Sequence, residues 1–216
     1  VYIITFFMTV FLVFVCQKPF FMLYNSAEEK GAAFGDYLQV MWHGLSLDAA
    51  VCGYLVAVPF LVTLISVWFH KIPLRKLLLP YYAVIALLVA VVFVVDMGLY
   101  PFWGFKLDAS VFLYLDSPEE ALASVSVGFL LIRVLLMLVL SVLLVWLMLK
   151  VTPRKVEAVK NRFLATLAML FIGGVLFVII RGGVTESTTN VGQVYFSSNQ
   201  FLNHSAVNPL FSLLSS

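Results

Sequence analysis

The sequence predicts an all-α membrane protein with five transmembrane helices in an N-in/C-out arrangement. The first observation is composition, because 63% of the 216 residues are hydrophobic and only 11% are charged. A soluble domain is about half apolar and about a quarter charged. The second observation is that hydrophobic residues form continuous runs of the length that a helix needs to cross a hydrocarbon core, about 20 residues. The third is an uneven distribution of Lys and Arg among the loops.

Five runs reach or approach the required length. They extend from Val1 to about Tyr24, from Ala49 to Phe69, from Leu77 to Val95, from about Val125 to Leu149, and from Phe163 to Ile180. A helix satisfies its backbone hydrogen bonds internally, as hydrocarbon requires. A transmembrane β-barrel would instead show short segments of alternating polarity. Pro59 removes a backbone hydrogen bond and predicts a kink in the second helix.

The loops after the second and fourth runs concentrate the positive charge. Their basic residues are Lys71, Arg75, Lys76, Lys150, Arg154, Lys155, Lys160 and Arg162. Lys and Arg are retained on the cytoplasmic side of a membrane, which predicts a cytoplasmic N-terminus and an external C-terminus. The net charge of +2 provides no broad basic field, so no nucleic-acid partner is expected.

Aromatic residues are frequent in the two predicted outer loops, 25–47 and 97–124. Such residues favour the membrane interface, because one end of the ring is apolar and the other tolerates water. We expect short interfacial helices or re-entrant-like hairpins on the outer leaflet in these loops. The alternative is that both loops are lids that only pack against the bundle.

The composition changes after the fifth run, which divides the chain into a five-helix transmembrane domain, 1–181, and an extracytoplasmic linker, 182–216. In the linker, apolar residues recur every three to four positions from Phe201 onward. This spacing predicts a short amphipathic helix lying near the membrane surface. The chain starts at Val1 inside a hydrophobic run and stops at Ser216, so we expect a longer protein with an extracytoplasmic domain after the linker.

The sequence contains no recognisable catalytic motif. It has no glycine-rich phosphate loop, no His-Glu-x-x-His pair and no Cys or His cluster at metal-binding spacing. His43, Ser46 and Asp48 lie close in sequence, but nothing orients them as a catalytic triad or supplies an oxyanion site. We therefore assign no catalytic, cofactor-binding or metal-binding residue within this chain. Cys16 and Cys52 lie in apolar runs and are interpreted as small buried hydrophobic residues.

Four ionisable residues fall in the outer half of the predicted spans: Arg133, Asp96, Asp48 and Lys18. Arg133 lies about eight residues into its helix, or roughly 12 Å deep at 1.5 Å per residue. A charge at the membrane centre costs about 2.5–3.5 kcal/mol on insertion scales, so it needs a partner. One hypothesis is an ion-pair cluster in which Arg133 faces the bundle interior and pairs with Asp96 or Asp48. The others are a head-group site for an anionic or zwitterionic lipid, and an ion or proton pathway.

Three stretches carry a resemblance to a known family: Trp42–Asp48 (WHGLSLD), Tyr100–Asp108 (YPFWGFKLD) and Asn190–Ser212 (NVGQVYFSSNQFLNHSAVNPLFS). Together with the five spans, they resemble the membrane part of the lipoteichoic acid synthase-like family within the sulfatase superfamily. The similarity is greatest to Bacteroidetes-type members and extends over essentially the whole chain. The tail, Asn190–Ser212, is the most specific of the three stretches.

The resemblance implies a bacterial cytoplasmic (inner) membrane location and an extracytoplasmic catalytic domain after this chain. That domain would carry a threonine nucleophile and a divalent metal such as manganese. It would transfer phosphoglycerol or phosphoethanolamine from a phospholipid, or hydrolyse a related phosphate or sulfate ester. The implied partners of the membrane part are a membrane phospholipid and its own catalytic domain. The alternatives are a small transporter or channel and a structural membrane subunit without activity.

Overall fold

The computed structural model describes residues 1–26, 32–69, 72–115, 126–154 and 160–216. The regular secondary structure of these residues is helical, with no β-strand among them. Five of the helices are long and apolar enough to cross a membrane: α1 (Tyr2–Tyr24), α3 (Leu45–Ser66), α4 (Leu74–Trp103), α6 (Val127–Val151) and α7 (Arg162–Arg181). The prediction of an all-α protein with five candidate spans is therefore confirmed.

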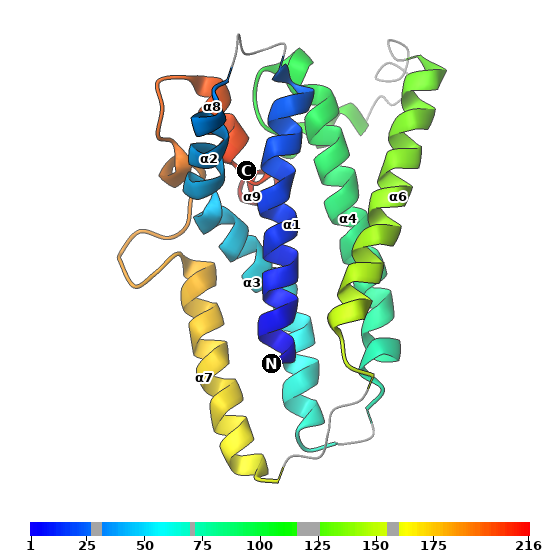
Figure 1. Cartoon of the computed structure of the whole chain (residues 1–216), viewed down its shortest axis with the longest axis vertical. Coiled ribbons are helices and arrows are strands. Elements are labelled where there is room, and N and C mark those ends of the chain that lie inside the picture. Colours follow the sequence, from blue (N-terminus) through cyan, green and yellow to red (C-terminus); the bar gives the residue numbers. More distant parts are fainter. Residues whose placement is uncertain (27–31, 70–71, 116–125, 155–159) are drawn as a thin grey trace.

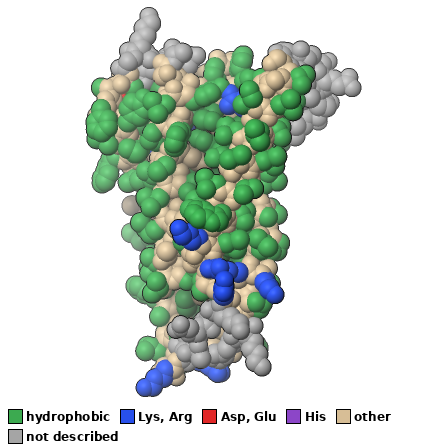
Figure 2. Space-filling model, turned by 45° about the vertical axis from the view of Figure 1, so that its right-hand side comes forward, with side chains coloured by type: hydrophobic (Ala, Val, Ile, Leu, Met, Phe, Trp, Pro, Cys, Tyr) green, Lys and Arg blue, Asp and Glu red, His purple; other side chains and the backbone are tan. Residues whose placement is uncertain are grey.

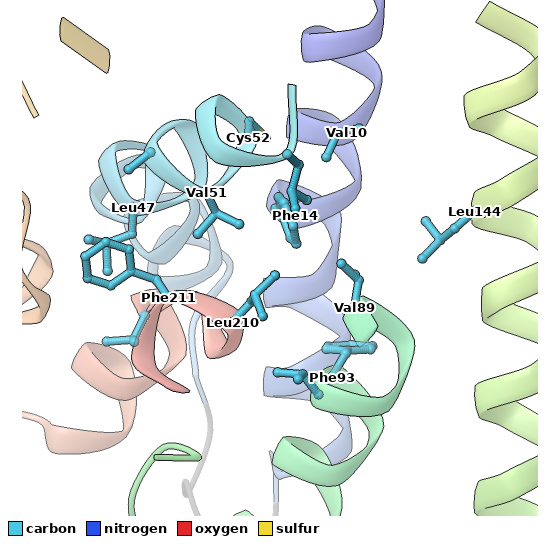
Figure 3. Packing of buried hydrophobic residues seen from close by; sticks show 14 of the residues in the cluster. Val10, Phe14, Leu47, Val51, Cys52, Val89, Phe93, Leu144, Leu210 and Phe211 are labelled. Atoms are coloured by element: carbon cyan, nitrogen blue, oxygen red, sulfur yellow. The ribbon is translucent and has the colours of Figure 1, made fainter. Parts of the chain in front are cut away.

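The helices form a bundle around α1 (Figure 1). α6 packs along α4, α7 packs along α3, and α1 lies between these two pairs. Hydrophobic side chains from α1, α3 and α4 meet in the core, where Phe14 lies close to Val51 and Val89 (Figure 3). Most large apolar side chains of α6 and α7 point outward, as expected of helices that face lipid.

α4 is longer than the sequence predicted. The expected end was Val95, but the helix continues through Asp96 and Tyr100 to Trp103 and is capped by Gly104 in the left-handed conformation, with φ 71°. Glycine adopts that conformation without steric cost, so it ends the helix and reverses the chain. As a result Asp96 lies inside α4 and is 1% exposed, whereas the sequence placed it at the end of the span.

Both predicted outer loops contain helix in their described parts. α2 (Phe34–His43) is joined to α3 through Gly44, and a 3₁₀ helix, η2 (Ala109–Leu115), follows α4. Phe34, Leu38 and Trp42 form an exposed apolar stripe on α2, while Val40 on the other face is fully buried. The helix itself is confirmed, and its location at a membrane interface stays a prediction. Residues 116–125 of the second loop lie outside the described residues.

The tail differs most from the expectation. The sequence predicted one short amphipathic helix near the membrane surface, whereas the structure has two short helices packed into the bundle. Their position relative to a membrane stays a prediction. The tail contains η3 (Val191–Val194), α8 (Gln200–Ala206) and α9 (Pro209–Ser215), and most residues from 201 to 212 are buried. α8 lies beside α2, and α9 lies against α3 and α4 (Figure 1). Leu210 and Phe211 reach the same core as Leu47 (Figure 3).

Gly44 allows α1, α3 and the tail to approach one another, which gives a first testable prediction. A Cβ at this position would overlap Lys18 Cε and the backbone oxygen of Ala206. Because the backbone oxygen cannot move aside easily, Gly44→Ala should destabilise the protein by about 1–3 kcal/mol, the usual cost of overpacking. Thermal unfolding in detergent measures the change. Gly35→Ala is the matched control in α2, where a Cβ would meet nothing within 4 Å, and a similar loss in both variants would contradict the packing argument.

Candidate functional site

Two buried ion pairs lie where α1, α3, α4 and the tail meet. Lys18 pairs with Asp48, and Lys106 pairs with Asp96. All four side chains are at most 7% exposed. We refer to these four residues and Asn208 as the polar layer. A buried charge is tolerated only when it is paired and hydrogen-bonded, so the polar layer fixes how these elements assemble.

The first pair connects α1, α3 and the tail through one carboxylate. Asp48 Oδ2 pairs with the Lys18 ammonium, and Asp48 Oδ1 accepts a hydrogen bond from Asn208 Nδ2 at 2.9 Å. Asn208 Oδ1 in turn accepts from the backbone N–H groups of Leu210 at 3.0 Å and Phe211 at 3.2 Å, capping the N-terminus of α9. Asparagine is a preferred N-cap residue. Its side chain therefore starts α9 and anchors it to α3 at the same time.

The second pair closes the turn after α4. Lys106 reaches back to Asp96 Oδ2, and the Leu107 N–H donates to Asp96 Oδ1 at 3.0 Å. The Lys106 ammonium also lies 3.7 Å from the centre of the Phe21 ring on α1, a favourable cation–π contact. Burial lowers the pKa of Lys106, and the adjacent Asp96 carboxylate opposes that shift. The turn at Gly104 makes this contact possible, because it directs the chain back along α4.

Aromatic contacts continue the connection between the tail and the bundle. The Tyr100 hydroxyl is 3.1 Å from His204 Nδ1. The His43 ring at the end of α2 stacks on Phe196, with centroids 4.3 Å apart and planes 4° from parallel. The three sequence stretches that carry the family resemblance, Trp42–Asp48, Tyr100–Asp108 and Asn190–Ser212, thus lie together at one end of the bundle.

The environment of His204 predicts a pH-dependent stability. Burial, with help from the positive charge of Lys106, lowers the pKa of His204 in the folded protein. The unfolded chain binds a proton at the ordinary imidazole pKa, about 6.5, so it takes up more protons than the folded chain below that pH. The contribution of neutral His204 to the free energy of unfolding should therefore be fully present above about pH 6.5. It should be lost as the pH decreases towards the lowered pKa of the folded protein. Unfolding temperatures between pH 8 and pH 5 measure this, and His204→Gln should flatten the profile. An unchanged slope in that variant would contradict the assignment to His204.

A small hollow lies beside the two ion pairs. Its polar lining includes Gln17, Lys18, Asp96, Lys106 and Ser205, and the Ser205 hydroxyl is buried without a hydrogen-bond partner. The space is about large enough for one water molecule, which would satisfy that hydroxyl. A lipid head group is too large to enter it in this conformation.

The structure corrects the predicted role of Arg133. The expectation that it pairs with Asp96 or Asp48 is wrong, because lysines hold both carboxylates. The Arg133 guanidinium instead donates to the Tyr24 hydroxyl and lies over the Tyr24 ring at 4.8 Å. It is half-buried beside Gly98 of α4. Of the four ionisable residues singled out in the sequence, Lys18 and Asp48 come together, and Asp96 and Arg133 have other partners.

Sequence reasoning missed Lys106 and Asn208. Lys106 was correctly expected in the loop after the third span, but its pairing with Asp96 was not foreseen. Asn208 was assigned to a surface linker. One available signal was the pair Asn208-Pro209, an N-cap residue followed by proline at the first helical position. Among the described residues, no three His, Cys, Asp or Glu side chains form a metal-binding group.

The chain was compared with models of known families, with curated proteins and with solved structures, and none of them matches it. The five apolar helices indicate a membrane protein.

Proposed function

We propose that this chain is the membrane platform of a cell-envelope enzyme of the sulfatase superfamily. Its reaction would be transfer of phosphoglycerol or phosphoethanolamine from a phospholipid, or hydrolysis of a related phosphate or sulfate ester, outside the cytoplasmic membrane. The divalent metal and the threonine nucleophile belong to a catalytic domain beyond this chain. One observation carries the proposal: the three stretches that resemble this family, far apart in sequence, meet in and around one buried polar layer.

The packing of the tail into the bundle supports this proposal, because a packed tail can hold a catalytic domain in position. Asn208 is bonded to Asp48, and His204 contacts Tyr100, so the tail is packed into the bundle and is not a free tether. A catalytic domain joined to a seated tail would be held at a fixed height above the leaflet that contains its lipid substrate. Holding two reactants close together raises their effective concentration and restricts their orientation.

The proposal requires the end of the bundle that contains the polar layer to lie at the outer side of the membrane. This predicts the N-in/C-out topology. The loops rich in Lys and Arg would then be cytoplasmic. Figure 2 shows most of the blue basic side chains of the drawn face in its lower half, and hydrophobic side chains over much of its upper half. Single cysteines at Arg154 and Glu119, in a background without Cys16 and Cys52, should be labelled from opposite sides, Arg154→Cys only after permeabilisation. Labelling of both in intact cells would contradict five spans.

Two experiments test the proposed function. The gene should continue past the codon for Ser216 into a domain with a sulfatase-type metal site, and a stop codon at that point would overturn the proposal. In the full-length protein, Asn208→Leu should then reduce turnover of long-chain lipid donors in vesicles more than turnover of a water-soluble donor analogue. Asn190→Leu is the matched control, because Asn190 is exposed in the same tail. An equal effect on both donors would contradict the platform role.

A further inference from the structure

Two connecting segments at one end of the bundle carry a large excess of positive charge. Segments 67–77 and 150–162 together contain eight Lys and Arg residues and one acidic residue, Glu157. This count covers every residue of the two segments, so pairing with Glu157 still leaves the excess in place. The first segment joins α3 to α4 and the second joins α6 to α7, which places both at the end opposite the polar layer (Figure 1). We refer to it as the basic end, and its charge attracts anions from outside the chain.

Arg75 is held at the basic end between α4 and α6. Its Nε donates a hydrogen bond to the backbone oxygen of Thr152, the C-cap residue of α6, at 2.6 Å. The Arg75 side chain is half-buried. Thr152 is fully buried, and its hydroxyl is 2.9 Å from the Tyr82 hydroxyl of α4. The bond to Thr152 orients the planar guanidinium through one of its five N–H donors, and arginine recognises phosphate through a parallel pair of such donors.

Arg154 supplies a second guanidinium within reach of the same position. It follows Thr152 by two residues and is exposed. Two residues of chain span at most about 7 Å, so the Cα of Arg154 lies close to the group that binds Arg75. The arginine stem is long and carries its charge outward. Arg75 and Arg154 can therefore approach one phosphate from the start of α4 and from the end of α6.

The end of α6 lies at the depth of lipid head groups. Its exposed apolar surface continues through Val142, which is 70% exposed, to Trp146. Lys150 follows one turn later, with its ammonium 4.8 Å from the centre of the Trp146 ring. Exposed tryptophan and lysine side chains at the end of a span favour the interface between hydrocarbon and water. The two arginines just beyond them are therefore at the level of phospholipid phosphates.

An apolar groove between α1, α4 and α6 starts close to the two arginines. Leu144, Leu147 and Met148 of α6 line one side, and Val10 of α1 lies across the groove from Leu144 (Figure 3). The Met148 backbone oxygen accepts a hydrogen bond from the Thr152 hydroxyl at 2.7 Å. The groove therefore begins about one helical turn from Thr152 and leads towards the middle of the span. It is shallow and apolar, which suits a hydrocarbon chain lying along it.

We propose that Arg75 and Arg154 bind the phosphodiester of an anionic glycerophospholipid in the leaflet at the basic end, with one acyl chain lying along the groove between α1 and α6. Basic pockets between transmembrane helices bind anionic head groups in this way. A zwitterionic head group brings an ammonium as well, which the excess of positive charge repels. The inference goes beyond the proposed function, because this leaflet is opposite the one that holds the proposed donor lipid. The bound lipid joins α1, α4 and α6 and so stabilises their packing.

Lipid retention by the chain in mild detergent tests the site. In detergent that contains equimolar phosphatidylglycerol and phosphatidylcholine, native mass spectrometry should show phosphatidylglycerol retained in preference. The unfolding temperature should rise with added phosphatidylglycerol, because a ligand of the folded state stabilises it. Arg75→Gln and Arg154→Gln should each weaken retention on the order of tenfold, the usual loss when a hydrogen bond to a charged group is removed. Arg154 is exposed, so Arg154→Gln keeps the test valid if Arg75→Gln does not fold.

Matched variants separate the site from its surroundings. Lys76 is exposed and adjacent to Arg75 in sequence, and Lys76→Gln should leave retention unchanged. Equal losses in Lys76→Gln and Arg75→Gln would overturn the site, because they would indicate general attraction of anionic lipid to positive charge. Leu147→Trp fills the groove and should weaken retention, whereas Leu143→Trp, at a residue of α6 that does not line the groove and is 46% exposed, should not. Equal retention in these two variants would overturn the placement of the acyl chain.

Two further outcomes would overturn the lipid assignment. Displacement of phosphatidylglycerol by millimolar inorganic phosphate would assign the arginines to a soluble anion. Retention that survives both Arg75→Gln and Arg154→Gln would show that neither arginine binds the lipid. A stop codon after Ser216 would overturn the proposed enzyme and leave the expected lipid retention unchanged, so the two proposals can fail separately.

Discussion

Lys18→Met should be among the most destabilising single substitutions in this chain. It removes the partner of Asp48, which is 0% exposed, and methionine fills the space of the lysine stem without its charge. Removing one member of a buried ion pair leaves an uncompensated charge and costs about 3–5 kcal/mol. The expected result is a large fall in the unfolding temperature in detergent, together with increased protease cleavage in the tail, because Asp48 also holds Asn208.

Two variants define the cause of that loss. Lys18→Met combined with Asp48→Asn should recover most of the stability, since the neutral amide can still accept a hydrogen bond from Asn208. Lys76→Met removes an exposed lysine at the start of α4 and should change stability by less than about 0.5 kcal/mol, as surface substitutions do. If the double variant were no more stable than Lys18→Met, the loss would come from packing around the lysine stem and not from the orphaned carboxylate.

The transmembrane helices were predictable because their signal is local. A run of about 20 apolar residues specifies a spanning helix almost independently of its neighbours, and α1, α6 and α7 end within about two residues of the predicted positions. The third span was ended too early, because the sequence criterion treats Asp96 as a residue that leaves the membrane. In the structure Asp96 is buried and pairs with Lys106, ten positions later. That contact depends on the turn at Gly104, which hydropathy alone does not predict.

The partners in the polar layer were not predictable for the same reason. The predicted position of each charge within its span correctly indicated which residues need counter-charges. It also placed Lys18 and Asp48 at the same level, as their ion pair requires. It did not determine which charges meet, since that depends on rotation of each helix and on the path of the turn at Gly104. The tail was harder still, because Asn208 contacts Asp48 across 160 residues of sequence. Apolar spacing predicts that a helix has a buried face but does not identify what covers it.

Lys106→Met should destabilise the protein to a similar extent, by about 3–5 kcal/mol, through a different contact. Among the described residues, it would leave Asp96 with the Leu107 N–H as its one hydrogen-bond donor, at 3.0 Å. It would also remove the cation–π contact with Phe21. The turn after α4 would lose its closure, so a lower unfolding temperature should be accompanied by faster hydrogen exchange at the Leu107 amide.

Lys150→Met, at an exposed lysine over Trp146, is the matched control for loss of a cation–π contact and should have a small effect. Lys106→Met with Asp96→Asn should restore stability, and failure of that rescue while Lys150→Met remains neutral would show that the ammonium is not required to neutralise Asp96.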